Sequence, residues 1–319
     1  MSAIEAEAPR GPDGWENWRA FLESRPATGE AWELSYYTDS FLVGAANDGL
    51  GPYKLLNTIA GGIGKPEPGA IELALVLRLD VHDDYEHVYR RTEWDKVDVS
   101  TYHGGAIGDE LSGLLALVLG IRLRCGGTTR IFGADWTKDP RGAPGEFQHH
   151  RPSIVRPRRS YPTTLPRIAR DSVSLPSAQD LLNTYPTLPR TDAIALVRAA
   201  RQYEQAVWIT DADPGVSWLQ LVSAIEIAAV HWREYKKGDV VERLQTNAPR
   251  IAAAVEPAGD EIARAAAKKL APLLRAKDRF RKFLAEFAPP PPEPRPTHAQ
   301  LDWNALDDAF STIYEGDFR

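Results

Sequence analysis

Cysteine and methionine are almost absent from this 319-residue sequence, which contains one of each. A single cysteine, Cys125, excludes an internal disulfide, as in proteins of a reducing compartment. The longest apolar run, residues 111–123, is too short to span a bilayer. Residues 1–18 are acidic and interrupted by Pro and Gly, without the apolar segment of a signal peptide. These absences predict a soluble, cytoplasmic protein with no membrane partner.

A strong excess of positive charge is also lacking, since the formal net charge is −6. This argues against a protein coated with cations for duplex binding, although a local basic groove stays compatible with it. Histidine and acidic residues cluster only in residues 82–87, where His82 and His87 are five apart and do not share a helical face. We therefore expect a solvated loop there, and neither a metal nor a cofactor.

The N-terminal half has a mixed pattern that predicts an α+β domain over residues 15–137, after a disordered N-terminus of residues 1–14. Residues 32–44 and 70–81 are rich in strand-forming side chains, and residues 86–100 alternate around charges as an exposed strand does. Residues 108–127 carry apolar side chains at helical spacing, with Asp109 at the start and Gly126-Gly127 as the expected end.

The remaining chain divides into a connecting segment and a helical domain. Residues 138–190 are rich in Pro and Arg, which prevents long regular elements, yet they keep enough apolar side chains to wrap along the first domain. From Thr191 to residue 319 the pattern is helical, with Asp213-Pro214 as a capping pair. Pro249 and Pro272 are expected to break or kink helices. A proline-rich spacer precedes a last helix expected from Asp302.

One acidic residue stands inside the most apolar of these helices. Residues 216–232 are apolar on nearly all sides, so we expect this helix to be the most buried, and Glu226 lies near its middle. A buried carboxylate needs a partner, because desolvating a lone charge costs several kcal/mol. Glu226 is therefore either at the rim of the buried face or part of a buried polar cluster.

A basic run follows between residues 264 and 282, where Asp278 is the only acid. Its candidate nucleic-acid contacts are Lys268, Lys269, Arg275, Arg279 and Lys282. One interpretation is a solvated amphipathic face, which is the usual explanation of such a run. The other is a stripe that contacts phosphates on an otherwise acidic protein.

The C-terminal half resembles the HEPN superfamily of bacterial toxins and antiviral nucleases, specifically its ApeA-like branch. The resemblance rests on residues 203–232, 277–296 and 301–319, and residues 109–132 followed by 139–144 look like the region that precedes the helical domain in such proteins. It implies a HEPN-like helical bundle over residues 191–319 and a homodimer through the C-terminal helices. It also implies metal-independent RNA cleavage by an Arg and a His on the last helix, with His as general acid or base.

The sequence departs from that pattern at the motif itself. Arg319 lies about where the Arg–His motif should begin, and no convincing motif His is present; Glu226 would orient an Arg, and His231 is the substitute candidate. The first hypothesis is a defence or toxin endoribonuclease whose motif is completed beyond Arg319 or by another chain. The second is a non-catalytic HEPN-like sensor that binds nucleic acid or a partner defence protein. A metabolic or structural protein with similar helices is the third, and we expect little ribonuclease activity from the 319 residues alone.

Overall fold

The computed structural model describes residues 11–57, 72–82, 107–133, 141–144, 152, 172–232 and 240–287. The chain forms two compact units, Met1–Ala228 and Ala229–Arg319. The first unit combines an antiparallel sheet with helices, and the described part of the second is helical, so the α+β part does precede further helices. The strand expected at 86–100, the proline-rich spacer, the last helix from Asp302 and Arg319 lie outside the described residues.

The first unit is built on a six-stranded sheet. Its strands, in spatial order, are β3 (Ala46–Leu50), β4 (Tyr53–Asn57), β5 (Glu72–Asp80), β1 (Ala31–Thr38), β6 (Arg124–Phe132) and β7 (Ala143–Pro144). A short parallel pair joins β2 (Leu42–Val43) to β8 (Val173–Ser174). Strands β1, β2 and β5 lie where the sequence predicted strands, because alternating apolar side chains there face one side of the sheet.

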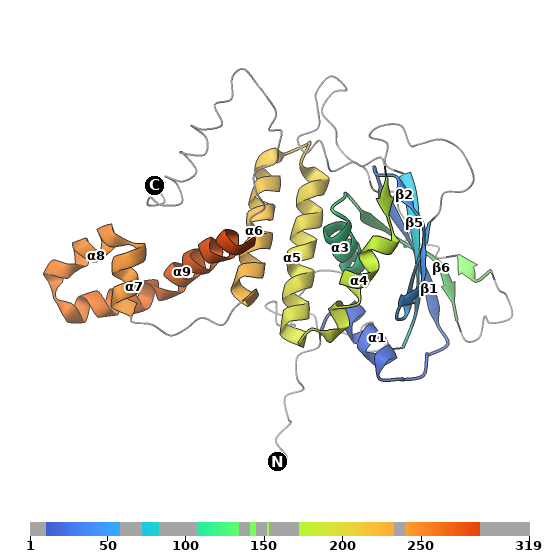
Figure 1. Cartoon of the computed structure of the whole chain (residues 1–319), viewed down its shortest axis with the longest axis horizontal. Helices are drawn as coiled ribbons and strands as arrows, with labels where there is room; N and C mark the ends of the chain where they lie inside the picture. Colours follow the sequence, from blue (N-terminus) through green and yellow to red (C-terminus); the bar gives the residue numbers. More distant parts are fainter. Residues whose placement is uncertain are drawn as a thin grey trace, which may run out of the picture. The chain divides into compact units, whose positions relative to one another are not determined.

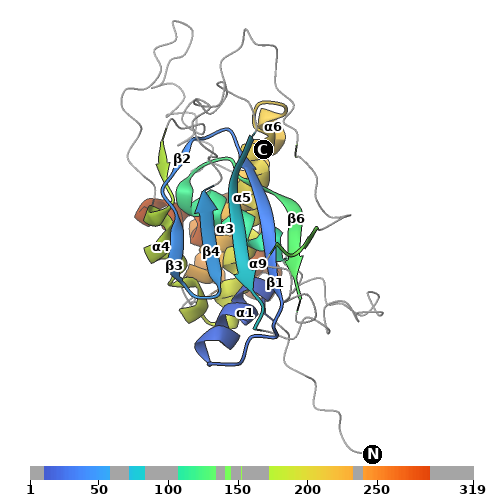
Figure 2. The ribbon, with the colours of Figure 1, turned by 90° about the vertical axis from the view of Figure 1, so that its right-hand side faces the viewer.

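That apolar side is covered by helices (Figures 1 and 2). The helices are α1 (Asp13–Leu22), α3 (Ile107–Leu119), α4 (Gln179–Leu182) and, against α3, α5 (Arg190–Ile209). Leu34, Leu55 and Leu77 of the sheet share one core cluster with Leu111 of α3 and Val197 of α5. Short 3-10 turns, Pro176–Ala178 and Tyr185–Thr187, contribute to the same cluster, so this part of the Pro/Arg-rich segment packs on the sheet unit.

Helix α5 therefore belongs to the sheet unit, although the sequence analysis placed the domain boundary at 190/191. Close packing with α3 explains the difference. A Cβ added at Gly113 of α3 would lie 3.1 Å from the backbone of Ala200 in α5, so glycine allows the two helices to approach closely. The first compact unit accordingly extends to Ala228.

Helix α3 ends earlier than the sequence predicted. It stops at Leu119, Gly120 adopts a positive φ of 62°, and the Ile121 N–H donates to the Ala116 carbonyl at 3.2 Å. This is a glycine C-terminal cap. Gly126 and Gly127, expected to end the helix, instead lie in β6, where antiparallel pairing with β1 holds the chain extended.

Helix α1 begins inside the stretch expected to be disordered. The buried carboxylate of Glu110 in α3 accepts the Asp13 N–H at 3.0 Å and the Gly14 N–H at 2.8 Å. These are first-turn donors, which have no partner within their own helix. The N-terminus of α1 is thus capped by a residue nearly a hundred positions away, and its first residues are ordered.

Helix α6 (Pro214–Trp232) starts as predicted but is not the most buried helix. The Val216 N–H donates to the Asp213 carboxylate at 3.0 Å, which confirms the capping role of Asp213. Trp218 and Leu219, however, are 51% and 64% exposed, and the apolar core lies instead on α3 and α5. Helix α6 is joined to α5 by hydrogen bonds from the Ser217 hydroxyl to the Ala206 carbonyl at 2.9 Å and from the Gln220 side-chain amide to the Gln205 side-chain oxygen at 3.2 Å.

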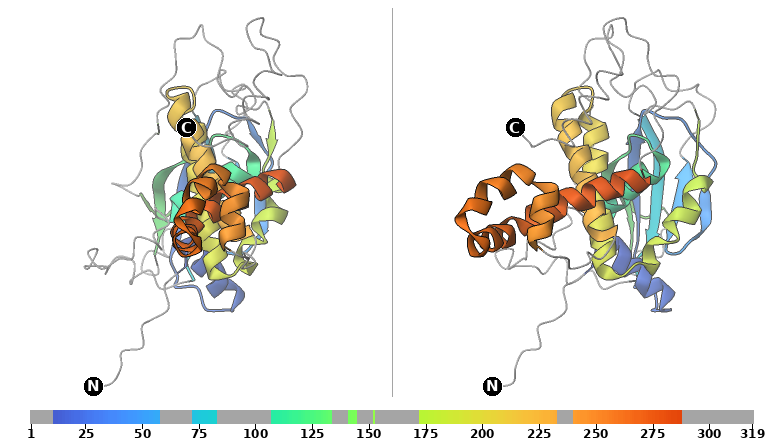
Figure 3. Two further views of the ribbon diagram at one scale, coloured as in Figure 1. Left: turned by 90° about the vertical axis from the view of Figure 1, so that its left-hand side faces the viewer. Right: turned by 60° about the vertical axis from the view of Figure 1, so that its left-hand side comes forward.

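The described part of the second unit contains α7 (Val240–Asn247), α8 (Pro249–Val255) and α9 (Asp260–Phe287) (Figure 3). The buried cluster of this unit consists of Leu244 of α7, Ala248 between α7 and α8, and Ala267 of α9. Pro249 separates α7 from α8 as predicted, whereas α9 runs through Pro272 without a break. None of the helices in the described ranges combines the length and the apolar character that a bilayer span requires.

Candidate functional site

Arg122 forms the most deeply buried ion cluster of the described residues. Its guanidinium donates to Asp39 Oδ2 at 2.8 Å, to Asp211 Oδ2 at 2.7 Å and to the Val207 carbonyl at 2.7 Å. The three charged side chains are at most 1% exposed. They join the chain after β1, the chain before β6 and the turn between α5 and α6. Since no ligand reaches a cluster so enclosed, we assign it a structural role.

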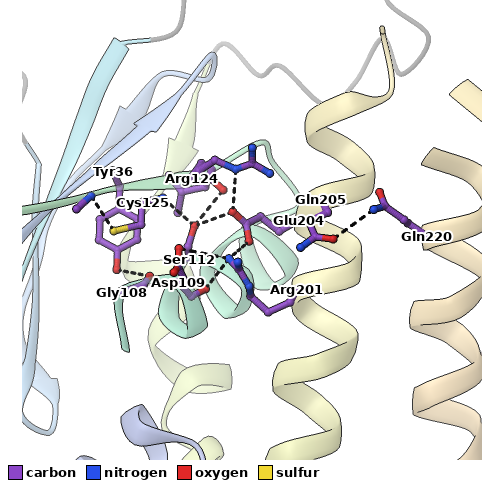
Figure 4. Close-up of polar contacts among 12 residues, drawn as sticks. Tyr36, Gly108, Asp109, Ser112, Arg124, Cys125, Arg201, Glu204, Gln205 and Gln220 are labelled. Carbon is purple, nitrogen blue, oxygen red and sulfur yellow. Dashed lines mark hydrogen bonds and ion pairs between the residues drawn. The ribbon is translucent and has the colours of Figure 1, made fainter. Parts of the chain in front are cut away.

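A second cluster surrounds Glu204 of α5 (Figure 4). Its carboxylate accepts hydrogen bonds from the Ser112 hydroxyl at 3.2 Å, from Arg124 Nε at 3.4 Å and from Arg201. Burial raises the pKa of Glu204, while the charges of Arg201 and Arg124 act in the opposite direction. Asp109 lies 3.7 Å from the Arg201 guanidinium, at the more exposed edge of the cluster. Helix α5 is thereby fixed to both α3 and β6.

Neighbouring groups of this cluster are not activated for catalysis. Burial raises the pKa of the Cys125 thiol to about 12, so the thiolate nucleophile is essentially absent at neutral pH. The Tyr36 hydroxyl donates to the Gly108 carbonyl at 2.9 Å, and its pKa is raised by the same burial. Arg124 packs over the Trp208 ring at 4.5 Å. We interpret the whole cluster as a polar part of the core.

The raised pKa of Glu204 has a consequence for pH dependence. The folded state keeps this proton over a pH range in which the unfolded chain, with a pKa of about 4.3, has lost it. The stability from Glu204 is therefore full below about pH 4.3 and is lost as the pH rises through the folded pKa. Glu204→Gln, which does not ionise, should gain stability relative to the wild type as the pH rises above about 4.3 and through the raised pKa of the folded state. Urea unfolding at several pH values measures the difference in the free energy of unfolding between the two proteins. A difference that does not change with pH would contradict the prediction.

The candidate catalytic residues are not brought together by the described part of the chain. Glu226 and His231 both lie on α6 and both are exposed. Among the described residues, neither a hydrogen bond nor an ion pair involves the Glu226 carboxylate, so the structure gives Glu226 the rim position rather than the buried one. Arg319 lies outside the described residues.

The basic candidates on α9 differ in their surroundings. Lys268 and Lys269 are exposed and form no ion pair with the described residues, and the same holds for Arg264 and Arg281. Lys282 is bonded to Asp278 at 2.9 Å. Of the other two candidates, Arg279 is half-buried, and Arg275 lies on α9 with its side chain outside the described set. The accessible cations of this helix are thus more numerous than its acids.

Sequence reasoning overlooked the buried charges of the first unit. A signal for Arg122 was present, because it is the only charge in the apolar run of residues 111–123. Glu204 carried no such signal, since it stands among polar neighbours on an amphipathic helix. Within the described ranges, no group of three His, Cys, Asp or Glu side chains is arranged to hold a metal ion.

Comparisons of the chain with protein-family models, with curated proteins and with solved structures give no match.

Proposed function

We propose that this protein is an RNA-binding module with a HEPN-like helical region, and that α9 contacts the RNA phosphates. The observation that carries the proposal is the set of exposed cations on α9 that have no acidic partner among the described residues: Arg264, Lys268, Lys269 and Arg281. Phosphate contacts of this kind supply most of the sequence-independent affinity for nucleic acids. The resemblance to HEPN proteins selects RNA as the nucleic acid.

The charge distribution along the chain supports this proposal. Residues 240–287 contain ten basic and six acidic residues, although the whole chain has a net charge of −6. Arg264 and Lys268 are four residues apart, so they share a face of α9 about 6 Å apart along its axis. Charges of alternating sign along a helix face indicate a solvated face with many salt bridges. Here Asp278 is the only acid between 264 and 282, and it forms an ion pair with Lys282.

The experiment is a binding titration of the full chain with a fluorescently labelled single-stranded RNA at several salt concentrations. For Lys268→Glu/Lys269→Glu we expect roughly tenfold weaker binding, and a slope of log affinity against log salt reduced by about 0.7 for each lost phosphate contact. The matched control is Arg19→Glu/Arg25→Glu, which changes the net charge equally on exposed residues of the first unit. Equal losses in both variants, or no binding by the wild type, would refute the α9 site.

A catalytic version of the same proposal has one supporting observation, the exposure of both Glu226 and His231 on α6. An exposed imidazole can transfer a proton near neutral pH, whereas an arginine stays protonated. This second candidate is the metal-independent HEPN endoribonuclease of a defence or toxin system. We expect the 319-residue chain to leave labelled RNA intact in chelator, because residues 1–319 contain no convincing Arg–His motif. Cleavage that disappears in His231→Ala would instead make His231 the catalytic residue.

Assembly follows from the same resemblance. A homodimer through the C-terminal helices, or a complex with a partner defence protein, would place two copies or two proteins on one RNA. Light scattering at micromolar concentration distinguishes a dimer from a monomer, and a monomer in the presence of RNA would count against the dimer.

A further inference from the structure

A row of charged side chains crosses the outer face of the sheet in the first unit. Lys54 of β4 lies directly opposite Arg78 of β5, Arg78 opposite Glu33 of β1, and Glu33 opposite Arg130 of β6. Their neighbours Leu34, Leu55 and Leu77 face the helices, so alternation directs the row to the other side, toward the viewer in Figure 2. We call Lys54, Arg78 and Arg130 the cation row; at about 4.8 Å per strand it spans roughly 14 Å.

Within the described part of the chain, the three cations of this row have one acidic partner between them. Glu33 is shared, with one oxygen 3.4 Å from Arg78 and the other 4.0 Å from Arg130. The Cζ atom of Arg78 also lies over the Phe132 ring, 4.4 Å from the ring centroid. Neither an ion pair nor a hydrogen bond joins the Lys54 ammonium group to the described residues. Arg130 also donates to the Arg141 carbonyl. Each guanidinium has five N–H donors, so most donors of the row form no hydrogen bond with the described residues.

One pair within the row is electrostatically unfavourable. Like charges directly opposite each other on adjacent strands destabilise a sheet, and Lys54 and Arg78 are such a pair. Asp80 is two residues from Arg78 on the same face, yet it forms no ion pair with the row. The side chains of Arg78 and Arg130 are 34% and 50% exposed, so an approaching anion reaches both.

We propose that the cation row is a second RNA-contacting surface, which binds backbone phosphates across β4, β5, β1 and β6. The choice of RNA rests on the proposed function, whereas the preference for a phosphate rests on the row itself. Planar guanidinium groups match phosphate oxygens in pairs, and the Arg78 guanidinium lies over the Phe132 ring. A row across four strands extends over more than one phosphate, which suits a polynucleotide better than a mononucleotide.

The test uses the full chain and the labelled RNA of the α9 experiment. Lys54→Gln/Arg130→Gln removes two cations without disturbing Arg78 on Phe132, and we expect binding weaker by roughly three- to tenfold and a salt slope reduced by about 1.4. Glu33→Gln removes the acid that, among the described residues, is paired with the row, and we expect binding about two- to threefold tighter. A purely structural role of Glu33 would lower the stability in urea and leave the affinity unchanged. Urea unfolding of each variant provides that comparison.

The outcomes separate the two surfaces. If the sheet variants leave affinity and slope unchanged while Lys268→Glu/Lys269→Glu weakens binding, the cation row is only a solvated face and the α9 proposal stands. If the sheet variants weaken binding and the α9 variant does not, the result supports the cation row as an RNA contact and refutes the α9 site. Displacement of the RNA by a mononucleotide at equal phosphate concentration would overturn the polynucleotide assignment. No change in any variant overturns both.

Discussion

Arg122→Ala is expected to destabilise the first unit by about 3–5 kcal/mol, because it leaves two buried carboxylates without their cation. Asp39 and Asp211 each lie within 2.8 Å of the Arg122 guanidinium, and the three side chains are excluded from solvent. The same substitution removes the hydrogen bond to the Val207 carbonyl. Urea or guanidinium unfolding, followed by tryptophan fluorescence, measures the change in the free energy of unfolding.

Two further variants make this prediction specific. Arg25→Ala removes an exposed ion pair with Glu23, and we expect a loss of about 0–1 kcal/mol. Arg122→Met combined with Asp39→Asn and Asp211→Asn removes all three charges together, and we expect part of the stability to return because no uncompensated charge stays buried. A loss below about 1 kcal/mol in Arg122→Ala would mean that solvent reaches the cluster in solution.

Glu110→Ala should cost about 2–4 kcal/mol, since it deprives two buried N–H groups of their acceptor at once. The Asp13 and Gly14 N–H groups are at 3.0 and 2.8 Å from the two carboxylate oxygens. The carboxylate also lies at the positive end of the α1 dipole, which adds to the loss when it is removed. Chemical denaturation measures the stability, and hydrogen exchange at Asp13 and Gly14 should become faster in the variant.

Glu110→Gln is the matched control, because its amide keeps one oxygen acceptor and nearly the same shape. We expect a smaller loss than in Glu110→Ala. Equal losses in the two variants would show that the negative charge, rather than the acceptor geometry, stabilises α1. Unchanged exchange at Asp13 and Gly14 in Glu110→Ala would mean that the carboxylate does not cap the helix.

The basic residues of α9 are the part of the candidate site that the sequence predicts only incompletely. Their accumulation is visible in the sequence, because eight cations and one acid between residues 264 and 282 need no structure to be counted. Which of these cations are accessible to a ligand depends on the fold. Lys268 and Lys269 are exposed, Arg279 is half-buried and Lys282 is occupied by Asp278. Burial and pairing come from neighbours on other turns and other helices.

The sequence by itself determined the elements whose signals are local. Strands β1 and β5 follow from alternating apolar side chains, helix α5 from its 3.6-residue periodicity, and the start of α6 from the Asp213-Pro214 cap. Each of these signals acts over a few residues along the chain. The order of an α+β part followed by helices was predictable for that reason.

Only the tertiary structure decided the features that depend on distant residues. Residues 124–132 form β6 because β1 offers them a hydrogen-bonded partner, and α5 joins the sheet unit because Gly113 admits it against α3. Helix α6 looked the most buried, yet α3 and α5 occupy the core. Arg122 meets Asp39 and Asp211 across 83 and 89 residues of sequence. Composition and periodicity report local preferences, whereas burial and ion pairing are properties of the packed chain.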